Sequence, residues 1–153
     1  MSRIDDFINQ WVDVKHVLPW LPDEPFFVEN ERRGEALSAL DCSGFQVVTV
    51  GLAEVLGEED LMKALGRGLS LASGDENWDS LRQGLHELGD RYPWRIAVIF
   101  TDGDVFATKD IHSFVRAVSV LQGLAADLSS ILERPYGQLE LFYVGQWSRF
   151  GGA

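Results

Sequence analysis

The chain is predicted to fold as an α/β protein with a small, three-stranded parallel sheet packed with helices. Two observations lead to this prediction. First, three apolar, β-rich runs without strict alternation, as expected of strands covered on both faces, span residues 45–52, 95–101 and 138–144. Second, the segments between them carry apolar residues at helical spacing. Strand–helix alternation implies parallel pairing with right-handed crossovers, in the order strand–helix–helix–strand–helix–strand.

The connection after the first strand is expected to hold two helices. The first begins near Glu58, where three acidic residues stand at the positive end of the helix dipole. A polar, glycine-containing loop follows at 71–76, and Asp75 or Asn77 is a suitable N-cap for the second helix. That helix is expected to reach about Leu88, since a glycine and then a proline come next.

The connection after the second strand is expected to be a turn followed by one long helix. An Asp-Gly pair at 102–103 turns the chain. From Lys109 onward one apolar stripe continues as far as Leu132, and Pro135 stops the helix. Such a helix is long enough to cross back over the sheet before the third strand.

The first part of the chain differs from the rest in amino-acid composition. Within residues 1–43, tryptophan and phenylalanine are interleaved with prolines, and a charged run follows at 29–35. Large apolar side chains are costly to leave in water, so this part is predicted to be an N-terminal extension packed on the main fold. A single domain of residues 1–153 is therefore expected, with its core at 44–145 and a C-terminal tail at 146–153.

The charge balance indicates which partners the chain can bind. The 24 acidic and 13 basic residues give a net charge of -11. Binding to a nucleic-acid backbone relies on lysine and arginine, so direct nucleic-acid binding is not expected. An anionic membrane surface would repel the chain, whereas a basic protein would be attracted to it.

The sequence shows no pattern typical of a metal site, a cofactor site or an export signal. Cys42 is the only cysteine, so an internal disulfide is excluded and a cysteine-rich zinc site is not expected. His16, His86 and His112 show no metal-ligand spacing, and no cofactor motif is present. There is no visible signal peptide and no run of roughly 20 apolar residues, so we expect a cytoplasmic protein with no membrane segment.

The second helix of the first connection has two contrasting faces. Its apolar face repeats at helical spacing, through Trp78, Leu81, Leu85 and Leu88. Another face gathers polar residues, namely Asp79, Gln83, His86 and Asp90. On periodicity alone a solvated face is the more common explanation, and a binding surface is the alternative.

This helix and the loop before it carry a resemblance to a known family. The segment Gly74-Asp75-Glu76-Asn77-Trp78-Asp79-Ser80-Leu81 has the pattern Gly-x-x-Asn-x-Asp-x-Leu. In this element order it resembles the barstar family of ribonuclease inhibitors, over residues 45–144. The resemblance implies an intracellular inhibitor or immunity protein, paired with a toxic ribonuclease, that inserts its acidic loop and second helix into the basic active site of the enzyme.

The resemblance also suggests which residues would bind the ribonuclease. Asn77 and Asp79 match the family's asparagine and aspartate, Leu81 matches its helix-packing leucine, and Glu76 matches an acidic loop residue. One departure is clear: where the best-known member has an aromatic residue and a second aspartate, this chain has Arg82 and Gln83. The predicted partner-binding residues are therefore Asp75, Glu76, Asn77, Asp79, Gln83 and His86.

An inhibitor of this kind is not expected to be an enzyme. The sequence leaves two other functions open. Asp102 and Asp104 follow a buried strand, and a Mg²⁺-dependent phosphatase could use two such carboxylates. Phosphatases of the haloacid dehalogenase type place their glycine after the second aspartate, whereas Gly103 lies between the two, so an Asp-Gly turn is favoured. The other alternative is an interaction domain of the same fold whose partner is not a nuclease.

Overall fold

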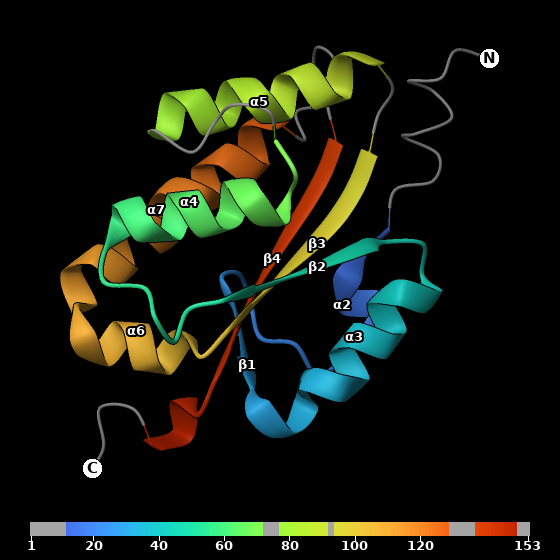
Figure 1. The fold of residues 1–153 in the computed structure, drawn as a ribbon. Coiled ribbons are helices and arrows are strands. Elements are labelled where there is room, and N and C mark those ends of the chain that lie inside the picture. The colour runs from blue at the N-terminus through green and yellow to red at the C-terminus, as the bar shows by residue number, and fades with distance from the viewer. Residues whose placement is uncertain (1–11, 72–76, 92–93, 129–136, 150–153) are drawn as a thin grey trace.

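The fold is described from a computed structural model, over residues 12–71, 77–91, 94–128 and 137–149. Four parallel strands form one sheet in the order β1–β4–β3–β2, with helices on both faces (Figure 1). The strands are β1 (Phe26–Glu29), β2 (Gln46–Gly51), β3 (Trp94–Thr101) and β4 (Gly137–Gly145). The α-helices are α2 (Val14–Val17), α3 (Arg33–Cys42), α4 (Glu58–Gly68), α5 (Trp78–Arg91), α6 (Gly103–Lys109) and α7 (Ile111–Leu128), with short 3-10 turns at Asn30–Arg32 and Trp147–Arg149.

The α/β class and the three expected strands are confirmed. β3 pairs in parallel with β2, aligning Val48 with Val98, and with β4, aligning Val98 with Leu141. β3 is buried almost throughout, as is β4. This burial explains why both strands appear in the sequence as continuous apolar runs rather than alternating ones.

The expected number of strands was wrong, because the sheet has a fourth strand, β1, at its edge. Its residues pair with 142–145 of β4, so that Phe26 aligns with Phe142. Pro25 carries no N–H to donate, and the pairing begins immediately after it. The segment expected to be an extension therefore supplies a strand of the sheet and, in α3, one of the helices that cover it.

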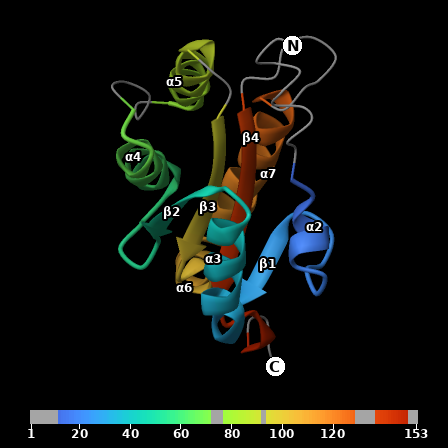
Figure 2. The same ribbon diagram turned by 90° about the vertical axis from the view of Figure 1, so that its right-hand side faces the viewer.

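The direction in which the chain crosses the sheet explains why both faces are covered. The chain passes from β1 at one edge to β2 at the other, and then returns through β3 to β4. Right-handed crossovers in opposite directions place their helices on opposite faces. Accordingly, α3 lies in front of β3 and β4 in Figure 2, whereas α7 lies behind them.

Each face of the sheet has its own core. On the α3 face, Leu18 and Leu40 pack with Ile99 and Phe142. On the other face the larger core joins strand side chains such as Val98 to all four helices of that side; among its fully buried members are Leu65, Leu81, Leu85, Phe106 and Leu121. Burying one such leucine stabilises the fold by roughly 1.5–3 kcal/mol, so these side chains fix the positions of the helices.

The helices differ from expectation at three points. α5 continues past Gly89 to Arg91. The expected turn at 102–103 instead begins a seven-residue helix, α6, whose Phe106 is fully buried in the larger core. The long helix starts as a separate element, α7, at Ile111. None of the helices within the described ranges has both the length and the apolar character needed to cross a membrane.

Candidate partner-binding surface on α5

The helix α5 is capped at its start and is attached to the fold by its apolar face. Asn77 Oδ1 accepts a hydrogen bond from the Ser80 N–H at 2.8 Å, which confirms Asn77 as the cap. Leu81 and Leu85 are both fully buried in the larger core. The Trp94 indole N–H, at the start of β3, donates to the Leu85 carbonyl at 3.4 Å. The backbone of α5 is therefore held rigidly relative to the sheet.

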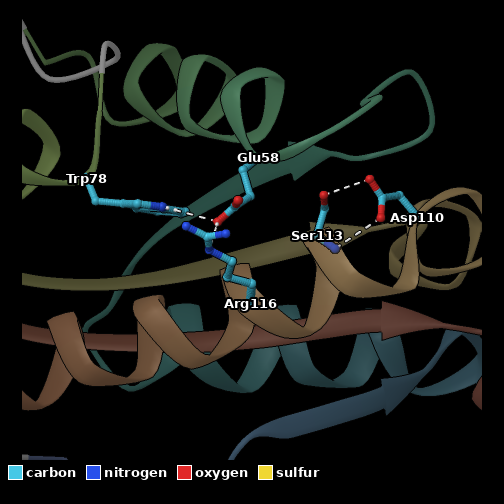
Figure 3. A network of polar contacts seen from close by, with 5 residues as sticks. All are labelled: Glu58, Trp78, Asp110, Ser113 and Arg116. Carbon is cyan, nitrogen blue, oxygen red and sulfur yellow. Dashed lines mark hydrogen bonds and ion pairs between the residues drawn. The ribbon is translucent and has the colours of Figure 1, made fainter.

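A carboxylate on α4 joins three helices at the beginning of α5 (Figure 3). Glu58 Oε1 accepts a hydrogen bond from the Trp78 indole N–H at 3.3 Å, and Arg116 Nε of α7 lies 3.5 Å from the same oxygen. The Glu58 side chain is 21% exposed and that of Arg116 is 74% exposed, so solvent screens the ion pair more than the hydrogen bond to Trp78. Glu58 therefore links the first turns of α4 and α5 to α7.

Figure 3 also shows how α7 begins. Asp110 accepts hydrogen bonds from the Ser113 hydroxyl at 2.7 Å and from the Ser113 N–H at 3.1 Å. These two hydrogen bonds hold the pKa of the Asp110 carboxyl below its ordinary value. The capped start of α7 separates it from α6 and fixes the helix that carries Arg116.

Two side chains of α5, those of Arg82 and His86, approach α7, although the Arg82 side chain remains 54% exposed. His86 Nε2 lies 3.4 Å from Asp127 Oδ2, and Arg82 Nε lies 4.0 Å from the same oxygen. The His86 side chain is only 29% exposed. His86 was expected on the exposed face of this helix, whereas its side chain is partly buried against α7.

The outer face of α5, defined here as Asp79, Gln83 and Glu87, is exposed to solvent. These residues follow one another at intervals of four and so lie along one side of the helix. Gln83 Nε2 donates to Glu87 Oε1 at 3.3 Å. Neither Asp79 nor Glu87 forms an ion pair with any basic residue in the part of the chain that the structure describes.

The structure brings together four of the six predicted binding residues. Asn77, Asp79 and Gln83 are exposed at the start and along the outer side of α5, and His86 lies beside them against α7. The other two, Asp75 and Glu76, lie outside the described residues. Glu87 was not among the predicted residues, although its spacing of four from Gln83 was visible in the sequence.

The alternative pair of aspartates lies at the carboxyl end of β3. Asp102 is the N-cap of α6 and has a left-handed backbone, with φ 57° and ψ 37°. Asp104 packs closely against Gly145 at the end of β4. Within the described ranges, no group of three or more His, Cys, Asp and Glu side chains is placed to hold a metal ion.

Comparisons with known proteins assign no family. No protein-family model matches the chain, and a search of curated proteins finds no significant match.

Proposed function

We propose that the chain is an inhibitor or immunity protein of the barstar type, which binds a basic ribonuclease and blocks its active site. The binding surface is the outer face of α5 together with Asn77 and the acidic residues at 75–76. The partner is a ribonuclease that the same cell secretes or delivers to competitors, and inhibition takes place in the cytoplasm.

The exposed carboxylates of α5 are the observation that carries this proposal. Asp79 and Glu87 are exposed to solvent and form no ion pair with the described basic residues, while Arg82 and His86 approach Asp127 of α7. Exposed carboxylates without an ion-pair partner among the described residues remain available to a cation on another protein. The two carboxylates are eight residues apart, or about 12 Å along the helix axis at 1.5 Å per residue.

The chemistry of a ribonuclease active site suits such a surface. Such sites place cationic groups where charge develops on the phosphoryl group during cleavage. Carboxylates held at fixed positions can occupy the same cationic groups and exclude RNA. Because α5 is anchored through Leu81, Leu85 and Glu58, binding would order few additional groups and would lose little conformational entropy.

Gln83 indicates how the partner would differ from the enzyme that the best-known family member inhibits. An amide can accept a hydrogen bond from a guanidinium group, but it does so without the added strength of a negative charge. Glu87, one turn further along, supplies a carboxylate on the same side of the helix. We therefore expect separate cationic groups of the partner to contact Asp79 and Glu87, rather than a single main anchor at residue 83.

The experiment that tests this proposal is affinity capture with the full chain as bait. Proteins of the source organism are passed over the wild-type bait and over a matched bait with Asp79→Asn and Glu87→Gln. The proposal predicts that salt elutes a basic, RNA-cleaving protein from the wild-type bait and much less of it from the variant. Capture of a protein without nuclease activity would support the interaction-domain alternative instead.

A further inference from the structure

The edge of β4 is paired over only part of its length. β1 pairs with residues 142–145, whereas residues 137–141 pair with β3 on one side and with no described strand on the other. An open strand edge presents main-chain N–H and C=O groups that another strand can pair with. This half of β4 is therefore a candidate for strand addition.

Two adjoining cavities border this open edge. The first, of about 220 Å³, lies between β4 and α7 and is lined by Gln122, Ala125 and Ala126. The second, of about 550 Å³, is lined by residues 12–15 and Asp23. Both are also lined by Glu24, Phe26 and Glu140. The first is smaller than the roughly 300–1,000 Å³ of a drug-sized ligand site, so it suits a single side chain. We call the open edge and its two cavities the edge groove.

The groups lining the edge groove favour a cationic occupant. Glu24, Glu140, Asp13 and Asp23 line it, and its single basic side chain, Lys15, lies 2.6 Å from Asp23. The pKa of the Glu140 carboxyl is raised to about 8. Burial is the main cause, and the negative charges of Glu24 and Asp13 add to it. A cation placed between these carboxylates would relieve their repulsion and favour ionised Glu140.

A second, independent observation points to a hydrogen-bond donor. Gln122 Nε2 donates to Glu24 Oε2 at 3.0 Å, which orients the amide across the first cavity. The amide oxygen, Gln122 Oε1, is buried and accepts no hydrogen bond from the described residues. A buried acceptor is costly to leave unsatisfied, and a guanidinium or ammonium group in the cavity would satisfy it.

We propose that the edge groove binds an extended, basic segment of a protein partner. The segment would add a strand to residues 137–141 of β4 and place a lysine or arginine side chain between Glu24 and Glu140. A second copy of this chain is a poor occupant, since each copy carries a net charge of -11. The inference does not depend on the proposed function, because the edge groove shares no residue with α5.

The test is selection of peptides from a random library against the immobilised full chain, at mildly alkaline pH where Glu140 ionises more readily. We expect the selected peptides to carry lysine or arginine within an extended sequence. Their affinity should fall by about tenfold or more for Glu24→Gln with Glu140→Gln, as expected for losing a charge pair worth at least about one decade in Kd. The control variant Glu59→Gln, on α4, should bind as the wild type does.

Two further readouts do not depend on these substitutions. Replacing the lysine or arginine of a selected peptide by glutamine should weaken binding to the wild-type chain, and bound peptide should slow amide hydrogen exchange at residues 139–141. The inference is overturned if no peptide is selected, if the peptides lack basic residues, or if binding is insensitive to the double variant. Protection of α5 in place of residues 139–141 would also overturn it.

Discussion

The Trp78 indole and the Glu58 carboxylate are joined by a hydrogen bond of 3.3 Å that connects the first residue of α5 to the first residue of α4. Arg116 approaches the same carboxylate oxygen from α7. The start of the proposed binding helix is thus positioned by a residue that does not belong to the binding surface. The residue that anchors the start of α5 is therefore different from the residues of α5 that are proposed to bind a partner.

Glu58→Ala should destabilise the protein through this junction. It removes the acceptor of Trp78 and the ion-pair partner of Arg116, so we expect the free energy of unfolding to fall by about 1–2 kcal/mol. The control is Glu59→Ala in the same first turn, whose exposed pair with Lys63 is worth about 0.5 kcal/mol or less. Urea denaturation measures both, and equal losses for the two variants would contradict the role given to Glu58.

The outer face of α5 should contribute to binding but not to stability. We expect Asp79→Asn with Glu87→Gln to change the free energy of unfolding by no more than about 0.5 kcal/mol, because both groups are exposed and form no ion pair with the basic residues that the structure describes. In contrast, Leu81→Ala should cost about 2–5 kcal/mol, because its side chain is fully buried. Thermal or urea unfolding distinguishes them, and a large loss for the double variant would show that these carboxylates are structural.

Glu140 should make stability depend on pH. Its pKa is raised from an ordinary 4.5 to about 8, so the folded state holds its proton more tightly than the unfolded state does. The free energy of unfolding should therefore include a contribution that decreases as pH rises from about 4.5 to about 8, by up to about 1.4 kcal/mol per pH unit. Denaturation of wild type and Glu140→Gln across this range checks it. Parallel pH profiles would contradict the prediction.

Two glycines should respond oppositely to alanine. A Cβ at Gly145 would lie 2.7 Å from Asp104 Oδ1 and 2.9 Å from the Asp104 backbone nitrogen, so we expect Gly145→Ala to cost about 1–3 kcal/mol. At Gly123, in the exposed middle of α7, a Cβ meets nothing within 4 Å. Gly123→Ala should therefore stabilise by about 0.5–1 kcal/mol. A neutral Gly145→Ala would show that Asp104 is not packed as described.

The sequence predicted most of the sheet because β2, β3 and β4 are long apolar runs. It did not predict β1, which has only four residues and follows a proline. α3 was missed because it lies in a charged segment of weak amphipathic character, and α6 because it has seven residues and begins at an Asp-Gly pair typical of turns. In these three elements, packing against the sheet outweighs local sequence preference.

The candidate site was predictable where it depends on spacing within one helix. Helical periodicity placed Asp79 and Gln83 on one side of α5, and it would have placed Glu87 there as well. The contacts of Arg82 and His86 with Asp127 join residues more than forty positions apart. No local pattern encodes such contacts, so the approach of Arg82 and His86 to α7 emerged only from the structure.

The proposed function requires this chain to block a ribonuclease through α5. A titration of the salt-eluted nuclease with purified chain, following cleavage of a fluorescent RNA, tests this requirement. We expect activity to fall to zero near one chain per enzyme, and Asp79→Asn with Glu87→Gln to shift the curve to higher concentration, by more at low salt than at high salt, because salt screens the charge interactions that the double variant removes. A captured nuclease that stays fully active in the presence of excess chain would contradict it.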